Sequence, residues 1–452
     1  MSEVMKGLGA GLAAVLSVTA IGHSAWATTS ESSGNAPDST AAARVAALEA
    51  VGGSEIGGSV NVLGVLGGEE LDDFLAVIEP FEEATGIDVE YEGTRDFGAV
   101  LQTRVDGGNP PELAVTPAIG LIAELADEGE VIDLRGVLGD EVLDASFDPG
   151  LIATASNDEI VFGAFNTINL GGLMWYNPQA YDGPTEPESW DELIEWATSK
   201  AAEGESPFCV TLESGAASGW PAADFIDEIV LRQAGPEFHT RWRNLEVDWT
   251  APEIRRAYET YGQMITPQGM AFGDVNSVLG TNFANAADPM FGDEPGCFLT
   301  QQATFMGGII AGNFPDLTPV DDYDFFAVPD FSTEFPNLRA IGGEIVAMFE
   351  ETPQSVALTE YLVSVEAGTL IAETGRWLSP NRQVDSSSYV DPFLSKASVI
   401  LQESEGSYNL ANSLMPQSVV DAFWHSGLEY TQDPDNLDEI LATVEAARQD
   451  AL

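Results

Sequence analysis

The chain has 452 residues, 44% of them hydrophobic, which is enough to bury a large core and predicts two or three domains. Acidic residues number 74 against 16 basic ones, and the formal net charge is −58. This balance excludes nucleic acid and anionic lipid as partners, because the chain offers no basic surface that could release counterions. We interpret so large an imbalance as adaptation to high salt, where counterions screen the repulsion between acidic side chains.

The N-terminal segment, residues 1–27, has the features of a secretory signal. Lys6 precedes an apolar stretch over residues 8–21, and Ala25-Trp26-Ala27 has the small-x-small pattern of a cleavage site. The protein is therefore expected to be exported to the periplasm or the outer face of the membrane. No cysteine follows the cleavage site, so no lipid anchor is expected. Residues 28–57 are rich in Ser, Ala and Gly, a composition typical of a flexible tether.

The next residues alternate between strand and helix patterns. Residues 60–66 predict a buried strand, residues 69–85 an amphipathic helix, and residues 87–91 a strand in which apolar and acidic residues alternate. A strand, a helix and a strand in succession predict a parallel sheet and an α/β fold. A further strand and two helices are predicted over residues 113–116, 97–105 and 121–128.

A long extended run over residues 161–176 contains the polar residues Asn166 and Asn169, as expected of a strand that crosses from one lobe to another. Ser189 and Glu192 form a capping box that starts a helix. The later predicted helices cover residues 251–264, part of 281–291, 352–375, 418–430 and 436–449, and the later strands cover residues 296–305, 324–328 and 339–349.

The most informative stretch is FCVTLESGAASGWPAADFIDEIVLR, residues 208–232. An apolar run over residues 208–212 predicts a strand, a Gly- and Ser-rich turn follows, and apolar residues recur at helical spacing after Pro221. Trp220 is thus expected on a loop at the start of a helix directly after a strand, where α/β folds bind ligands. The alternative for Trp220 is packing in the core.

The chain has two cysteines, Cys209 and Cys297, each in a short strand-like run. Neighbouring strands could present them to each other, and an even cysteine count in an exported chain predicts one disulfide. The alternative is a pair of buried thiols.

The sequence lacks the motifs of several enzyme classes. It contains neither the nucleophile elbow G-x-S-x-G nor the phosphate loop G-x-x-x-x-G-K-S/T. Only His239 and His425 remain after the signal, so a histidine-based zinc site or catalytic triad is poorly supplied. A glycosidase pair of carboxylates is not excluded by counting, but nothing singles one out. The acidic clusters at residues 321–324 and 433–435 are expected to be solvated loops rather than calcium sites, and no cofactor is expected.

Three tryptophans in or beside predicted loops, Trp220, Trp377 and Trp424, suggest a carbohydrate site. Sugars present apolar C–H faces, which an aromatic ring can cover, and a rim of hydroxyls, which charged and amide side chains can hydrogen-bond. Core packing is the alternative for Trp377 and Trp424.

The order and spacing of several motifs resemble the carbohydrate-binding branch, family 1, of the extracellular solute-binding proteins of ABC importers, and within it the α-glucoside-binding type. The motifs are SGAASGWPAADFIDEIVLR (214–232), TRDF (94–97), GNPPEL (108–113), WYNP (175–178), GCFLTQQATF (296–305), GGEIVAMF (342–349), LSPN (378–381) and MPQSVVDAFW (415–424). The resemblance extends from about residue 60 to the C-terminus.

This resemblance implies the type II, maltose-binding-protein-like fold, in which two α/β lobes enclose a ligand cleft. Its implied division is residues 58–163 plus 334–376 for lobe one and 166–328 plus 380–452 for lobe two, with hinge crossings near 164–169, 329–334 and 376–381. Pattern alone does not reveal this discontinuous division.

The resemblance also implies the residues of the site. Trp424 of the F-W pair would stack on the sugar, and the implied polar contacts from lobe one are Thr94, Arg95, Asp96 and Glu344, with Gly343 beside it. The other lobe or the crossing would supply Asp224 and Asn169. A surface ion pair is the alternative for Arg95, and helix capping is the alternative for Asp224.

Three departures from the family pattern bear on the choice of sugar. Glu344 stands where Asp is usual and would crowd the site by one methylene. Thr167 replaces a common Lys, and Gly171 and Gly172 fall where relatives often carry Lys and Ser. The pocket is therefore expected to be less basic than that of most relatives.

The expected function is that of a monomeric, non-catalytic binding protein. It would deliver an α-glucoside such as trehalose, maltose or sucrose to the permease subunits of an ABC transporter. The alternatives are a secreted glycoside-acting enzyme, which would turn over α-glucosides, and a surface polysaccharide-binding protein, which would bind insoluble glycans. The missing catalytic motifs disfavour the former, and the lack of internal repeats disfavours the latter.

The net charge of −58 predicts that the fold depends on salt. At low ionic strength the acidic side chains repel one another over long distances, so the melting temperature should fall by several degrees below about 0.1 M salt. Differential scanning fluorimetry between about 0.05 and about 2 M NaCl measures this. A melting temperature that stays flat over the range would contradict the interpretation of the charge.

Overall fold

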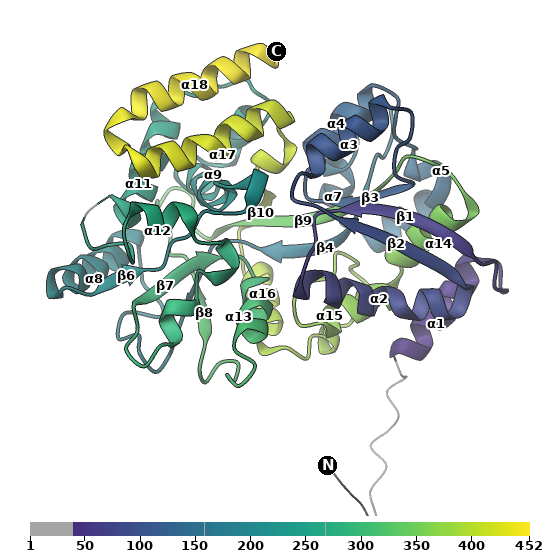
Figure 1. Cartoon of the computed structure of the whole chain (residues 1–452), viewed down its shortest axis with the longest axis horizontal. Coiled ribbons are helices and arrows are strands. Elements are labelled where there is room, and N and C mark those ends of the chain that lie inside the picture. The colour runs from purple at the N-terminus through teal and green to yellow at the C-terminus, as the bar shows by residue number, and fades with distance from the viewer. Residues whose placement is uncertain (1–38, 158, 267) are drawn as a thin grey trace, which may run out of the picture. The chain divides into compact units, whose positions relative to one another are not determined.

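The computed structural model describes residues 39–452 apart from residues 158 and 267 (Figure 1). The predicted signal over residues 1–27 and the first part of the predicted tether lie outside the described residues. The described chain is an α/β structure with two sheets.

The first sheet has the strand order β10-β9-β3-β1-β2, and β4 also pairs with β9. Its strands are β1 (Gly58–Gly64), β2 (Ile87–Gly93), β3 (Leu113–Thr116), β4 (Ala164–Leu170), β9 (Leu338–Met348) and β10 (Gly406–Asn409). β1 is parallel to both β2 and β3, as the strand–helix–strand pattern predicts, whereas β9 is antiparallel to β3 and to β4. The helices of this part are α1 (Ser39–Ala50), α2 (Glu69–Thr85), α3 (Phe97–Asp106), α4 (Ile119–Asp127), α5 (Leu134–Leu138), α6 (Asp140–Ser146), α7 (Pro149–Thr154), α14 (Pro353–Leu362) and α15 (Val365–Glu373).

The second sheet has the strand order β6-β7-β5-β8. Its strands are β5 (Leu173–Tyr176), β6 (Ser206–Phe208), β7 (Cys297–Gln302) and β8 (Asp324–Ala327). The helices of this part are α8 (Trp190–Glu203), α9 (Trp220–Ala234), α10 (Pro236–Arg243), α11 (Pro252–Ile265), α12 (Val275–Gly280), α13 (Met306–Asn313), α16 (Pro392–Gln402), α17 (Gln417–Gln432) and α18 (Leu437–Asp450). The sequence had identified the helical spacing of Phe225, Ile226, Ile229 and Val230 in α9, and all four are buried here.

The first sheet packs in one hydrophobic core and the second sheet contributes to two others, and these two parts are the two lobes of the molecule. Residues close in sequence join the cores of different lobes where the chain passes between them: Phe165 of β4 lies in the core of the first lobe and Leu170 in a core of the second. Trp377 and Leu378 are divided in the same way. Figure 1 shows β4 and β9 in the middle, between the two groups of elements.

The crossing segments are hydrogen-bonded to one another. β4 pairs with β9 over residues from Ala164 to Leu170. On its other side, the backbone N–H of Ile168 donates to the carbonyl of Leu378 at 2.8 Å, and the N–H of Leu378 donates back at 2.9 Å. Two strands and the extended segment at Leu378 therefore run side by side where the lobes join.

The predicted tether over residues 28–57 is wrong for residues 39–50, which form α1. Ala43 and Ala47 are completely buried, and α1 contacts α2, α14 and α15. Two alanines four residues apart make a flat strip that lets a helix approach its neighbours closely. An Ala-rich composition is shared by tethers and helices, so composition alone does not distinguish them.

Three predicted elements differ in extent from the observed ones. The run over residues 161–176 is divided at Gly171 and Gly172 into β4 and β5, which belong to different sheets. The run over residues 208–212 pairs as a strand only up to Phe208. The helix over residues 352–375 is two helices, because Ser364 caps α15 by accepting a hydrogen bond from the N–H of Ala367.

Within the described part of the chain, no single helix is long and apolar enough to cross a bilayer. The pair α14 and α15 reaches the required length and hydropathy together, with a bend of 60° between its members.

The predicted disulfide between Cys209 and Cys297 is confirmed. Cys297 begins β7, and the N–H of Cys209 donates to the carbonyl of Leu299 in that strand. The bond therefore anchors the chain leaving β6 to the neighbouring strand, within the second lobe.

Removing this disulfide should destabilise the protein. The bond joins residues 88 positions apart. For a loop of this length the chain-entropy model gives a loss of about 4–5 kcal/mol in the free energy of unfolding. The double variant C209S/C297S should therefore unfold at lower urea concentration than the wild type. A titration of denatured, unreduced wild-type protein that found two free thiols would overturn the assignment.

Candidate functional site

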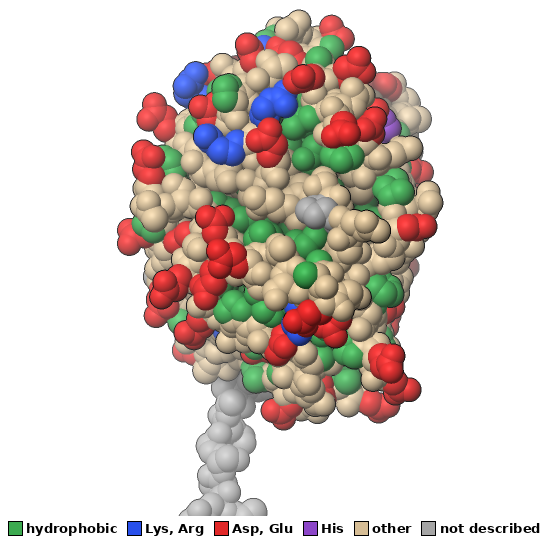
Figure 2. Space-filling model, turned by 90° about the vertical axis from the view of Figure 1, so that its left-hand side faces the viewer, with side chains coloured by type: hydrophobic (Ala, Val, Ile, Leu, Met, Phe, Trp, Pro, Cys, Tyr) green, Lys and Arg blue, Asp and Glu red, His purple; other side chains and the backbone are tan. Residues whose placement is uncertain are grey.

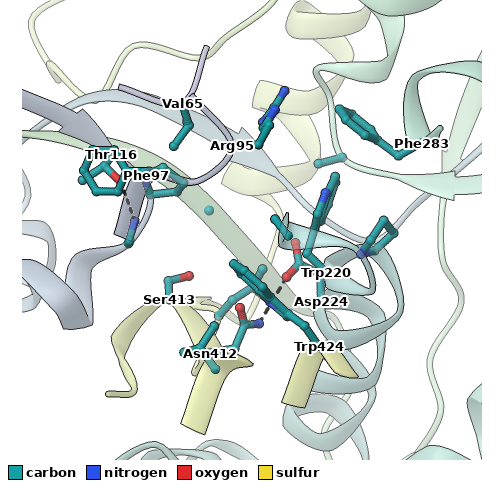
Figure 3. Close-up of a pocket in the computed structure, with 18 of the residues that line it drawn as sticks. Val65, Arg95, Phe97, Thr116, Trp220, Asp224, Phe283, Asn412, Ser413 and Trp424 are labelled. Atoms are coloured by element: carbon teal, nitrogen blue, oxygen red, sulfur yellow. Dashed lines mark hydrogen bonds between the residues drawn. The ribbon is translucent and has the colours of Figure 1, made fainter. Parts of the chain in front are cut away.

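A cavity of about 670 Å³ lies between the lobes and is lined by residues of both. Its volume falls in the range typical of small-molecule sites. Figure 3 shows Val65, Phe97 and Thr116 on one side of the cavity, and Trp220 and Trp424 on the other. The two lobes thus supply opposite walls.

An aromatic cluster forms part of the wall from lobe two. Trp220 is the first residue of α9, and its ring lies 5.1 Å from that of Phe283 and 6.0 Å from that of Phe305, measured between centroids. Trp220 is half-buried and lines the cavity. Its neighbours hold it in edge-on contacts, so one face of the indole can remain available to a ligand.

Trp424, in the second turn of α17, is brought beside the start of α9 by a close approach of the two helices. Gly219 precedes α9 with a φ of +98°, and a Cβ there would lie 2.1 Å from the carbonyl oxygen of Trp424. Glycine is therefore required by both conformation and space. The indole N–H of Trp424 is buried without a hydrogen-bond partner among the described residues.

Trp377 has a mixed role. It lines the cavity, but only 2% of it is exposed and it belongs to the first hydrophobic core. The guanidinium of Arg376 lies 5.8 Å from its ring centroid. Packing in the core, the alternative that the sequence left open, therefore buries most of the Trp377 side chain.

Arg95, from the loop before α3, spans the cavity. Its guanidinium donates to the Glu70 carboxylate at 3.0 Å and lies 5.4 Å from the ring centroid of Phe283 in the other lobe. Asp96 also lines the cavity. Thr94 is not among the lining residues, and its hydroxyl accepts a hydrogen bond from the backbone N–H of Asp96.

Glu344 and Gly343 reach the cavity from β9. A Cβ at position 343 would lie 2.3 Å from the carbonyl oxygen of Thr167, so only glycine allows β4 and β9 to pair this closely. Glu344 is 6% exposed, and one of its carboxylate oxygens is buried without a partner among the described residues. Burial, and to a smaller degree the charge of Glu70, raises the pKa of Glu344 to about 8.

Asp224 lies one turn into α9 and faces the cavity (Figure 3). It accepts a hydrogen bond of 3.2 Å from the side-chain amide of Asn412. Burial and the nearby Asp227 raise the pKa of Asp224 to about 8, although the Asn412 bond acts in the opposite direction. Helix capping, the alternative for Asp224, is wrong, since no side chain caps the start of α9. Asn169 also lines the cavity, and its side-chain oxygen accepts from the hydroxyl of Thr304 at 3.2 Å.

Several lining residues were not predicted from the sequence. They are Glu70, Phe97, Glu228, Phe283, Phe305 and Asn412. Phe97 and Phe305 end two of the quoted motifs, TRDF and GCFLTQQATF, which was a usable signal. Glu70 and Asn412 have no local pattern that distinguishes them from other surface residues.

A row of buried polar residues in α9 supports the site from behind. Asp227 lies 2.6 Å from Nε2 of His239 and accepts from the backbone and side-chain amides of Asn412 at 2.8 and 2.9 Å. Glu228 accepts from the buried Arg232 at 2.7 Å. Among the described residues, no group of three or more His, Cys, Asp or Glu side chains could hold a metal ion.

The raised pKa of Glu344 predicts a pH-dependent stability that Glu344→Gln should remove. Between the ordinary value of 4.5 and about 8, the folded state keeps a proton that the unfolded state has released. The free energy of unfolding contributed by this group therefore falls as the pH rises through that interval. Between about pH 5 and about pH 8.5, the melting temperature of the wild type should therefore fall by several degrees more than that of E344Q. Glu79→Gln, at an exposed position of α2, serves as the control, and a constant difference for E344Q would contradict the assignment.

Comparisons with known proteins agree with this arrangement. The family described as "Bacterial extracellular solute-binding protein" matches residues 67–368. The osmoprotective compounds-binding protein of Synechocystis sp. is 31% identical over 398 residues, which cover 87% of this chain and 93% of that protein. The alpha-glucosides-binding periplasmic protein of Rhizobium meliloti is 27% identical over 390 residues, covering 83% of each chain.

Solved structures support the fold. A chitin oligosaccharide binding protein superimposes with a TM-score of 0.73 at 15% identity, covering 88% of this chain and 99% of that one. A maltose-bound protein from T. maritima superimposes with a TM-score of 0.68 at 17% identity, covering 87% of this chain and all of that one, 100%. The fold is thus the two-lobed, maltose-binding-protein-like one with a ligand cleft between the lobes. The chain belongs to the bacterial extracellular solute-binding proteins.

Proposed function

We propose that this protein captures an α-glucoside or a similar oligosaccharide outside the cytoplasm and delivers it to the permease subunits of an ABC transporter. The observation that carries the proposal is the composition of the cavity, with Trp220 and Trp424 on one wall and Arg95 and Asp96 on the other. Aromatic rings suit the apolar faces of a sugar, and charged side chains suit its hydroxyls.

The names of the relatives support this choice of ligand. One relative is named for osmoprotective compounds and another for α-glucosides. An α-glucoside that protects against osmotic stress would meet both descriptions. It would also suit a protein of net charge −58, for which we infer a salt-rich environment.

We further propose that binding closes the lobes about the three crossing segments. The division is the one implied by the resemblance, residues 58–163 plus 334–376 against residues 166–328 plus 380–452. Each crossing is short, and β4, β9 and the segment at Leu378 are hydrogen-bonded side by side. A ligand that touches both walls would favour the closed arrangement by its additional contacts.

A secreted glycoside-acting enzyme is disfavoured, because the family and its named relatives are binding proteins. We expect the protein to act as an exported monomer without a cofactor. A thermal-shift screen with trehalose, maltose and sucrose in molar salt, followed by calorimetry, tests the proposal. Stabilisation without hydrolysis of the sugar is the expected result, whereas turnover would favour the enzyme.

Trp220→Ala, Trp424→Ala and Arg95→Ala should each weaken binding by about tenfold or more, without unfolding the protein. Micromolar affinity corresponds to about −8 kcal/mol, and one stacked ring or charged hydrogen bond can contribute about 1–3 kcal/mol of it. Titration calorimetry measures the affinity, and the tryptophan fluorescence of the wild type should change when the glucoside is added.

Trp196→Ala is the matched control. Trp196 is also half-buried, but it does not line the cavity, and its indole N–H donates to Asp182. Its loss should leave the affinity unchanged. If both pocket tryptophan variants also bound as well as the wild type, the site would be misplaced even though the family is established.

A further inference from the structure

The charges around the cavity are strongly unbalanced. Six acidic residues line it, Glu70, Asp96, Asp224, Glu228, Glu344 and Asp421, against Arg95 and His425. Glu70 is paired with Arg95, and Glu228 is paired with Arg232, which lies behind the wall. Within the described part of the chain, the other four acids have no Lys, Arg or His within salt-bridge distance. These unpaired lining acids are Asp96, Asp224, Glu344 and Asp421.

The geometry at the crossing between the lobes disfavours a compensating cation there. A Cβ at Gly172 would lie 2.0 Å from a carboxylate oxygen of Glu228, and Gly172 has a φ of +62°. A Cβ at Gly171 would lie 3.1 Å from the carbonyl oxygen of Ala340. Thr167 is completely buried. Among the described residues that line the cavity, Arg95 is the one arginine, and its guanidinium already donates to Glu70.

We propose that the pocket selects uncharged glycosides and rejects glycosides that carry a carboxylate, because, among the described residues, four unpaired acids line it and no free cation does: Asp96, Asp421, Glu344 on β9 and Asp224 on α9. The inference rests on the proposed function and narrows its substrate class. A ligand carboxylate would leave water for a cavity in which no free cation replaces its hydration, and it would face the exposed carboxylates of Asp96 and Asp421. The hydroxyls of a neutral glycoside carry no charge and therefore need no cation in the cavity.

The protonation of Glu344 and Asp224 fits this selection. Burial raises the pKa of both Glu344 and Asp224 to about 8, so near neutral pH each carboxyl keeps a proton that it can donate to a sugar oxygen. Glu344 is faced by Glu70 of α2, by Arg95, by Tyr91 of β2 and by Thr167 of β4. Asp224 is faced by Asp227 and Glu228 of α9 and by Asn412. Above about pH 8 both acids lose their protons, and the rejection of an anionic ligand should become stronger.

The test uses three forms of one glucoside, the tightest binder among trehalose, maltose and sucrose. They are the unmodified sugar, its 6-amino-6-deoxy derivative and its C6 carboxylate. Calorimetry near pH 7, at the lowest salt at which the wild type is folded, limits screening of the charges. We expect the carboxylate to bind at least about tenfold more weakly than the parent sugar, and the amine to bind within about threefold of it.

The amine controls for the size of the substituent, because both derivatives change the same carbon. If the amine lost as much affinity as the carboxylate, size rather than charge would be selected and the proposal would be overturned. Equal binding of the carboxylate and the parent sugar would overturn it as well, while leaving the proposed function intact. If none of the three parent sugars bound, the proposed function itself would fail, and the selection with it.

A variant series assigns the pH dependence of the rejection to Glu344 and Asp224. In the wild type the ratio of carboxylate to parent dissociation constants should rise severalfold between about pH 7 and about pH 9. In the double variant E344Q/D224N, whose amides do not titrate, this ratio should stay constant. Glu79→Gln removes one exposed acid outside the cavity and should behave as the wild type. A ratio that rises equally in the double variant would show that other groups are responsible and would overturn the assignment.

Discussion

The buried carboxylate of Asp227 holds together the elements from which the lobe-two wall of the pocket is made. It is fully enclosed in α9, lies against His239 of α10, and accepts two hydrogen bonds from Asn412. A buried carboxylate must be hydrogen-bonded to be tolerated, so these partners have little freedom to move. Asn412 can therefore also donate to Asp224, one turn earlier in α9. The segment around Asn412 is thereby held against the helix. The position of the candidate ligand contacts thus depends on a residue that does not itself line the cavity.

The few basic residues of this acidic chain serve partly as internal connections. Figure 2 shows acidic side chains scattered over one face of the molecule, with only a few basic ones among them. Four arginines, Arg232, Arg339, Arg376 and Arg448, are instead buried, and three of them connect separate elements. Arg232 ties α9 to the carbonyls of residues 328 and 329, Arg376 pairs with Asp73 of α2, and Arg448 ties α18 to the carbonyl of Leu245. Guanidinium groups suit this role, because they stay charged and can bind several oxygens at once. The same use of arginine leaves little positive charge for the pocket.

The sequence predicts best the features that depend on local pattern. The strand–helix–strand opening, the buried face of α9 and the disulfide follow from periodicity and cysteine count, and the structure has all three. Trp220 and Asp224 were found because they share one motif. In contrast, Phe283 becomes a lining residue only because Trp220 and Arg95 converge on it from separate segments. The partner of Arg95, Glu70, lies 25 residues away, and no local pattern marks so distant a contact. The helix α1 was missed because burial of its alanines depends on helices far along the chain.

The contact between Arg95 and Phe283 already joins the two walls of the cavity without a ligand. A cation over an aromatic ring at an exposed site is worth about 0.5–1 kcal/mol, whereas micromolar binding of a sugar corresponds to about −8 kcal/mol. A ligand that entered between the two side chains would therefore exchange a weak contact for stronger ones. Glu70 would continue to hold the guanidinium at the edge of the cavity, where it could donate to a hydroxyl without first being ordered. So weak a contact can yield to a ligand, because its strength is small against the affinity of a micromolar binder.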